Sequence, residues 1–159
     1  MSDNDQNRYL CFMLGKEEYA IPLLTVREVI AVPEITPVPQ TPSHFVGIMN
    51  LRGQVISVLD LRSKLGIKPN ASADTAVIIC DLHPNSLGVI VDKVESVLNP
   101  DPTHLSPRPQ MENSKANDYV TGIYRKEERL ILLIDIAKAL GATDLGLAAR
   151  TSGEQKKAA

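Results

Sequence analysis

Residues 47–66, GIMNLRGQVISVLDLRSKLG, and residues 122–141, GIYRKEERLILLIDIAKALG, are two versions of one pattern, and they decide the fold of this chain. Each version begins with Gly-Ile, carries an apolar run, reaches an aspartate and ends at a glycine. A second pair, residues 20–30 and 88–98, repeats in the same order. Two copies of about 65–70 residues predict two similar small subdomains and not a solenoid, which needs more copies of a shorter unit. The alternative is that two unrelated hydrophobic hairpins resemble each other.

Each copy consists mainly of short stretches rich in β-branched residues, which favour strands. The clearest expected strands are residues 9–14, 75–82 and 87–94. Hairpin turns are expected at residues 15–18, 50–53 and 125–128. Strands at this spacing are typical of antiparallel barrels and not of a parallel α/β sheet.

Both repeated blocks predict a short helix after their last strand. Asp60 and Asp135 suit the N-cap, because a carboxylate accepts the free backbone N–H groups of a first turn. Gly66 and Gly141 suit the helix end, where a positive φ costs glycine little. We therefore interpret the two aspartates as helix caps and not as a catalytic pair.

Three strands, QVISVLDL, TAVIICDL and RLILLIDI, are apolar at consecutive positions and hence on both faces. One face of each would fill its own barrel. The other must be covered by the second barrel, by a helix or by another protein. Two possibilities stay open: complete coverage within the chain, or apolar surface left over for partners, which we expect.

The composition excludes several classes of protein. A net charge of −2 and a pI of about 5.9 argue against nucleic-acid binding, which needs a basic surface. Cys11 and Cys80 each lie inside an apolar stretch and predict buried thiols in a reducing compartment. No signal peptide and no apolar stretch of about 20 residues is present, so we expect a cytosolic protein without membrane insertion.

No motif for catalysis is present. The chain lacks a glycine-rich phosphate loop, an H-E-x-x-H helix and a G-x-S-x-G elbow. His44, His83 and His104 are isolated in or beside loops, and two cysteines are too few for a structural zinc site. We therefore expect no enzyme activity, no metal and no cofactor.

Four phrases together resemble the CheW family of bacterial chemotaxis coupling proteins. They are LGKEEYAIPLLTVREVI, PVPQTPSHFVGIMNLRGQVISVLDLRSKLG, LGVIVDKVESVL and YVTGIYRKEERLILLIDIAKAL. The resemblance implies an all-β fold of two five-stranded SH3-like β-barrels side by side, with short helices. It implies a domain over residues 8–142 with intertwined subdomains at roughly 19–74 and 75–142, and residues 8–18 pairing at their junction. Residues 1–7 would be a disordered tail, and residues 143–159 a tail that is partly helical and then disordered.

The resemblance also implies what this chain does. Members of the family are non-catalytic adaptors that bridge the cytoplasmic tips of transmembrane chemoreceptors and the regulatory domain of the histidine kinase CheA. They build receptor–kinase arrays at the inner face of the cell membrane. The alternative, which the sequence does not separate, is a coupling protein of a sister chemosensory pathway with twitching motility or another output.

The family's binding surfaces can be transferred to this sequence. The receptor would dock in a groove between the barrels, at Val26, Thr36, Val77, Gly88, Val94 and Val97. The kinase would contact the hairpin of the first barrel at Leu51, Arg52, Gly53, Val55 and Ile56. Glu28 and Arg52 match signature residues and would form an ion pair that holds this hairpin, or would contact partners directly. Ala20 and Ala31 stand where many members have glycine, so the backbone would approach a receptor less closely at these two positions.

Overall fold

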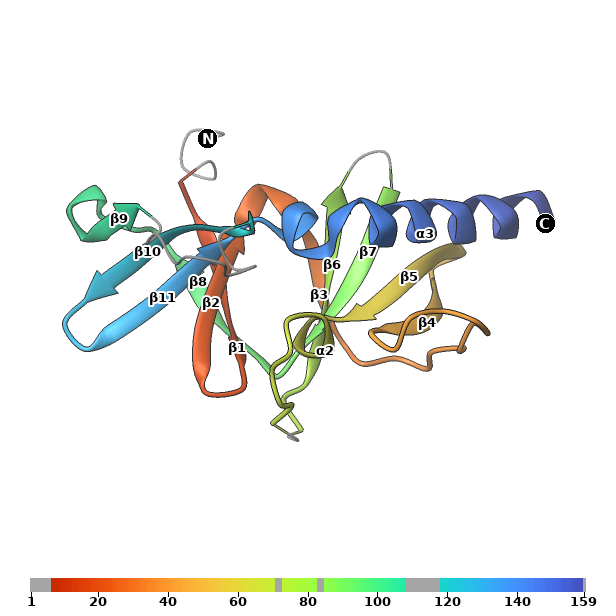
Figure 1. Ribbon diagram of the computed structural model, residues 1–159, viewed down its shortest axis with the longest axis horizontal. Coiled ribbons are helices and arrows are strands. Elements are labelled where there is room, and N and C mark those ends of the chain that lie inside the picture. Colours follow the sequence, from red (N-terminus) through yellow and green to blue (C-terminus); the bar gives the residue numbers. More distant parts are fainter. Residues whose placement is uncertain (1–6, 71–72, 83–84, 108–117, 159) are drawn as a thin grey trace.

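The computed structural model describes residues 7–70, 73–82, 85–107 and 118–158, and the backbone alone for 149–158. It consists of two mixed β-sheets that lie side by side (Figure 1). The six-stranded sheet has the order β8 (Lys93–Leu98), β1 (Tyr9–Leu14), β2 (Glu17–Pro22), β11 (Arg129–Ile134), β10 (Val120–Lys126), β9 (Leu105–Pro107). The five-stranded sheet has the order β3 (Val26–Ala31), β6 (Ala76–Leu82), β7 (Asn85–Val91), β5 (Gln54–Asp60), β4 (Phe45–Leu51). The helices are η1 (Leu23–Thr25), α2 (Leu61–Lys64), η2 (Pro102–His104) and α3 (Ile136–Ala158).

The two repeated blocks fold in the same way down to their irregularities. In the β4–β5 hairpin the pairing skips one residue between Phe45 and Gly47. In the β10–β11 hairpin it skips one residue between Val120 and Gly122, which is the corresponding place in the repeat. Since bulges are specific local features, their match supports duplication over a chance likeness of two hairpins.

The two copies exchange their first hairpins. The β1–β2 hairpin opens the first copy, yet β2 pairs in parallel with β11 of the second copy. The β6–β7 hairpin opens the second copy, yet β7 pairs in parallel with β5 of the first. The boundary at residues 74 and 75 thus separates the copies along the chain, but it does not separate the sheets. Sheet membership therefore differs from the predicted split into 19–74 and 75–142, because β2, β6 and β7 lie in the sheet of the other copy.

The prediction of five strands in each barrel was wrong for one sheet. The sixth strand is β9, which pairs with β10 over three residues. The corresponding stretch of the first copy makes a single bridge, Thr36 to Ile48. The flanking Pro33 and Pro37 have no N–H to donate, which limits the ladder there. The two ends of the molecule thus share one plan and differ in the length of this closing strand.

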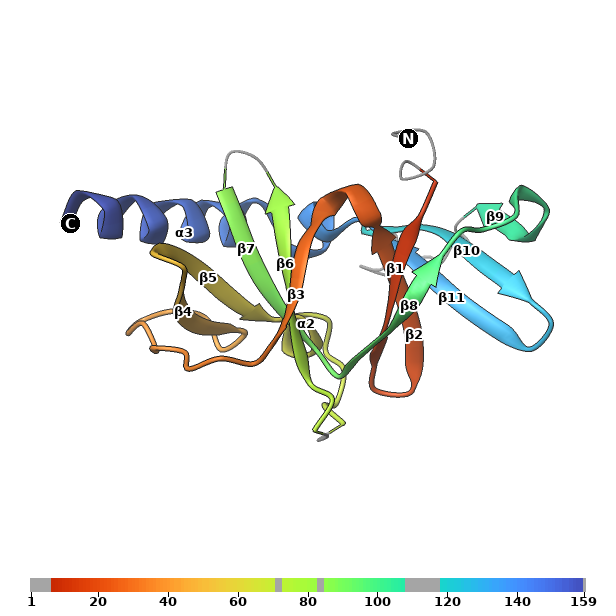
Figure 2. The ribbon, with the colours of Figure 1, turned by 180° about the vertical axis from the view of Figure 1, so that it is seen from behind.

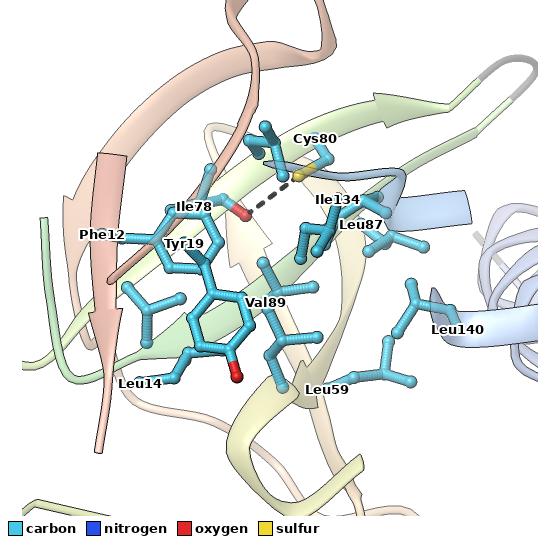
Figure 3. Close-up of a cluster of buried hydrophobic side chains, with 14 of the residues drawn as sticks. Phe12, Leu14, Tyr19, Leu59, Ile78, Cys80, Leu87, Val89, Ile134 and Leu140 are labelled. Carbon is cyan, nitrogen blue, oxygen red and sulfur yellow. Dashed lines mark hydrogen bonds between the residues drawn. The ribbon is translucent and has the colours of Figure 1, made fainter. Parts of the chain in front are cut away.

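Strands β5, β6 and β11, which are apolar on both faces, contribute to three hydrophobic clusters. Ile56 and Val58 of β5 point into a cluster inside the five-stranded sheet, which also contains Met49. Leu59 of β5 points into a central cluster that joins both sheets, with Phe12 from β1 (Figure 3). The third cluster lies inside the six-stranded sheet. The expectation of partner surface on these three strands was largely wrong, since the other sheet covers their second faces.

The capping prediction was right, but the predicted helix length was not. Asp60 accepts from the backbone N–H groups of Arg62 and Ser63, and Asp135 accepts from that of Lys138. Gly141 has φ 83° and ψ 168°, so it ends the first helical turns as expected. The chain then resumes a helix, and α3 continues to Ala158 along the five-stranded sheet (Figures 1 and 2). The predicted N-terminal tail lies almost wholly outside the described residues.

Candidate partner-binding surfaces

The tip of the β4–β5 hairpin is a tight turn at Arg52 and Gly53. Both residues have positive φ, 51° and 88°, as a two-residue hairpin turn of the right twist requires. The side chain of Asn50 supports the turn, because its Oδ1 accepts from the Gly53 N–H at 2.8 Å. A positive φ is uncommon for arginine, so the turn fixes the backbone of Arg52 in a conformation that this residue rarely adopts.

An ion pair joins this turn to the edge strand β3. Arg52 donates from Nη2 to Oε1 of Glu28 and from Nη1 to Oε2. The hydrogen bond from Arg52 lowers the pKa of Glu28 below its usual 4.5 and raises that of Arg52. The Arg52 side chain as a whole stays 64% exposed. The pair therefore fixes a charged group at the hairpin tip that remains accessible to another molecule.

The neighbouring Arg27 makes a second connection. Its Nη1 donates to Oε1 of Gln54 at 2.9 Å, at the start of β5. It also lies 3.4 Å from Oγ of Ser86 in β7. Arg27 lies at an irregularity of β3, because the pairing with β6 skips it between Val26 and Glu28. The edge strand β3 thus contacts the β4–β5 hairpin at two points, Arg52 at the tip and Gln54 at the start of β5.

A family model described as the CheW-like domain matches residues 8–144 of this sequence. The chain belongs to this family. It is 34% identical over 141 residues to the chemotaxis protein CheW of Klebsiella aerogenes, covering 87% of this chain and 84% of the relative. It is 30% identical to the chemotaxis protein CheW of Helicobacter pylori over 140 residues, covering 87% and 84%.

The fold agrees with the same family. The crystal structure of the scaffolding protein TtCheW from Thermoanaerobacter tengcongensis superposes with a TM-score of 0.77 and 30% identity, over 87% of this chain and 95% of that one. Membership places this CheW-like chain among chemotaxis scaffolding proteins, which are not enzymes. In the described residues, no helix is long and apolar enough to cross a membrane.

The five kinase-contact candidates fall into two groups. Leu51, Arg52 and Gly53 form the tip of the hairpin, and Val55 is half-buried beside it. Ile56 is fully buried in the cluster inside the sheet, so its side chain does not reach a partner. A surface cavity of about 460 Å³ adjoins this tip and is lined by Pro33, Glu34, Thr36, Ile48, Met49, Asn50 and Val55.

The receptor-contact candidates also fall into groups, some of them accessible at the edge strands and others buried inside the five-stranded sheet. Val26 of β3 and Val94 of β8 are half-buried against the central cluster, and Val97 of β8 is 50% exposed. Val77 is fully buried, and a Cβ at Gly88 would lie 2.7 Å from Cγ1 of Val77. Gly88 therefore leaves room for the buried side chain of Val77 on the same face of the sheet. Thr36 bridges to β4 and lines the cavity at the hairpin.

Sequence reasoning missed one surface residue that the repeat could have revealed. Val29 of β3 is 40% exposed and corresponds in the repeat to Val97 of β8. The edge strands β3 and β8 lie on the same side of the molecule (Figure 2). Leu24 and Val32, which flank β3, are exposed as well. Apolar exposure in the described residues is thus concentrated near these two edges, with Leu130 of β11 as a separate site.

Among the described residues, no three His, Cys, Asp or Glu side chains come together as a metal site would require. Cys11 and Cys80 are both buried and free. Burial raises the pKa of Cys11 to about 11 and that of Cys80 to about 12, so neither thiol has the thiolate character of a nucleophile.

Proposed function

We propose that this chain couples chemoreceptors to the histidine kinase CheA in cytoplasmic signalling arrays at the membrane. The observation that carries the proposal is the match to the CheW-like domain over residues 8–144. An adaptor needs two separate surfaces, and the geometry supports two. One is the β4–β5 tip of the five-stranded sheet, and the other includes β8 of the six-stranded sheet.

We assign the kinase regulatory domain to the hairpin tip, at Leu51, Arg52, Gly53 and Val55. A central arginine beside apolar side chains is typical of residues that dominate an interface. Because Glu28 and the turn already hold Arg52, little side-chain freedom remains to be lost on binding. The ion pair thus prepares the contact, and the exposed part of the guanidinium makes it.

We assign the receptor tip to the edge strands β3 and β8. Its helices would pack their apolar side chains on Val97 and Val29, with Val26 and Val94 below. Val77 and Gly88 contribute only indirectly, through the packing inside the five-stranded sheet that carries β3. This assignment adds Val29 to the surface and removes direct contact from the buried residues.

The test is isothermal titration with two partners in separate experiments, a kinase regulatory domain and a receptor cytoplasmic fragment. Arg52→Ala should weaken kinase binding at least about tenfold, or about 1.4 kcal/mol, and leave receptor binding unchanged. Val97→Asp should weaken receptor binding and leave kinase binding unchanged. Lys126→Ala, at the corresponding tip of the other hairpin, serves as a control for a general charge effect. Absence of micromolar binding to either partner contradicts the proposal, and binding only to a kinase of a sister chemosensory pathway reassigns the pathway.

A further inference from the structure

In residues 136–148 of α3, whose side chains the structure describes, one buried side chain is charged. Leu140, Asp144 and Ala148 are each about 1% exposed and follow one another at four-residue spacing. Leu140 and Ala148 belong to the central cluster, and Figure 3 shows Leu140 beside Leu59 of β5. Asp144 lies between them, at a position where a helix packed on a sheet normally has an apolar residue.

Two basic side chains meet this buried carboxylate. Nε2 of His44 lies 2.7 Å from Oδ1 of Asp144 in a hydrogen bond. Nζ of Lys64 lies 2.8 Å from Oδ2, outside hydrogen-bonding geometry, so that contact is electrostatic. A buried carboxylate that loses one of its partners destabilises the packing that buries it. Docking of α3 therefore depends on His44 and Lys64.

Both partners belong to the base of the β4–β5 hairpin. His44 directly precedes β4, and its carbonyl accepts from the Asp60 N–H at 2.7 Å, where β5 ends. Lys64 is the last residue of α2, which follows β5. The other hairpin has the same backbone contact, from Asp135 N–H to the carbonyl of Tyr119 at 2.8 Å. Ala139 stands there in place of Lys64, so the second copy has no matching ion pair.

The helix also has a joint between Leu140 and Asp144. Gly141 departs from helical geometry, and a Cβ placed there would have no neighbour within 4 Å. Beyond Gly141 the described residues of α3 carry fully buried side chains only at Asp144 and Ala148. A segment with few buried apolar side chains, beginning at a joint, is one that opens locally at modest cost.

We infer that α3 beyond Gly141 is a hinged brace, and that Asp144 is the positioning residue through which it stiffens the β4–β5 hairpin. With α3 docked, Asp144 joins the start of β4 to the end of α2. With α3 released, the hairpin keeps its strand pairing but loses this restraint at its base. The importance of the brace for signalling rests on the proposed kinase contact, whereas the existence of the brace does not.

The test is hydrogen–deuterium exchange of the full chain without partners. Lys64→Met keeps the length of the side chain and leaves the Asp144 carboxylate with His44 alone. Exchange should rise about tenfold in residues 142–148 and several-fold in β4, while β10 stays unchanged. Asp144→Asn added to Lys64→Met removes the uncompensated charge and should restore slow exchange in both segments. Lys138→Met, at an exposed lysine of the same helix, is the matched control and should change nothing.

Three results would overturn the inference. Unchanged exchange in residues 142–148 of Lys64→Met would show that Asp144 does not hold the helix. Faster exchange there with unchanged β4 would show that the helix does not brace the hairpin. An equal rise in β10, or no restoration by Asp144→Asn, would show general destabilisation. None of these results depends on the kinase, so failure of the adaptor proposal would be seen separately by titration.

Discussion

The β4–β5 and β10–β11 hairpins have the same backbone and different surfaces. Both contain a bulge at the same place, both turn through a residue with positive φ, and both end in an aspartate that caps a helix. At the first tip Arg52 faces Glu28, whereas the corresponding residues of the second copy are Glu127 and Ser96, which lack the charges for such a pair. Duplication therefore supplied two equivalent hairpins, and different side chains at the tip and base distinguish the first from the second.

The chain crosses from one sheet to the other between β2 and β3 and again between β7 and β8, and these two crossovers also differ in their side chains. From β2 to β3 the chain passes through η1, but from β7 to β8 it passes through the single residue Asp92. The Asp92 carboxylate is buried and accepts from the backbone N–H groups of Gly15 and Asn70 and from Nη1 of Arg62. Arg62 also donates to Asp60. The second crossover is therefore held by a charged network that ties together four segments.

The largest predicted effect is at this network. Asp92→Ala leaves Nη1 of Arg62 and two backbone N–H groups without their acceptor, although Asp60 still pairs with the guanidinium. The loss of these three hydrogen bonds should cost about 3 kcal/mol of unfolding free energy. Urea unfolding measures it. Leu24→Ala, in the other crossover at an exposed position, should change stability by less than about 0.5 kcal/mol. Equal losses for the two variants would mean that the crossovers are not different in kind.

A smaller effect should separate the two bulge glycines. A Cβ at Gly47 would lie 2.2 Å from the carbonyl oxygen of Thr36, with φ 154°. At Gly122 the corresponding contact, to the carbonyl oxygen of Ser106, is 3.1 Å. Gly47→Ala should therefore destabilise by about 1–3 kcal/mol and Gly122→Ala by less. Thermal unfolding of the two variants checks the order, and the reverse order would contradict the account of the closing strands.

The ion pair at the hairpin tip should matter less to stability than to binding. Folding lowers the pKa of Glu28 below 4.5, because Arg52 stabilises the ionised carboxylate. The pair therefore stabilises the folded state above pH 4.5, and this stabilisation is lost as the pH falls through the lower pKa that Glu28 has in the folded state. Arg52→Ala should raise the Glu28 pKa back toward 4.5 in a carbon-13 NMR titration. The midpoint of urea unfolding should fall only slightly at neutral pH. An unchanged Glu28 pKa would show that the pair is absent in solution.

The two cysteines should behave alike, although they lie in different sheets. Burial raises the pKa of Cys11 to about 11 and that of Cys80 to about 12, so neither thiolate forms at neutral pH. The native protein should not react with a thiol-specific disulfide reagent, and both thiols should react after denaturation. Rapid reaction of one thiol in the native protein would reveal an opening of its sheet.

The sequence was sufficient for the features that depend on local chemistry or on the repeat. The turn at Arg52 and Gly53 and the caps at Asp60 and Asp135 follow from neighbouring residues. The exchange of hairpins was not predictable in this way, because pairing β7 with β5 or with β11 satisfies the same apolar pattern. The full length of α3 was missed, since residues 149–158 contain no apolar side chain larger than alanine.

The candidate surfaces show the same limit. Val97 and Arg52 are exposed at an edge and a turn, where sequence position says most about exposure. Val77 and Ile56 lie in strands that are apolar at consecutive positions, so the sequence did not say which face was covered. Lys64, His44 and Asp144 are far apart in sequence, and only the packing of α3 brings them together.

The central claim is that the β4–β5 tip and the edge strands β3 and β8 form two separate surfaces that bind different partners at the same time. Sedimentation velocity of this chain mixed with a kinase regulatory domain and a receptor cytoplasmic fragment tests it most directly. The account predicts a complex that contains all three proteins, and Arg52→Ala should release the kinase domain while the receptor fragment stays bound. Two mutually exclusive binary complexes, with the partners competing for one surface, would contradict it.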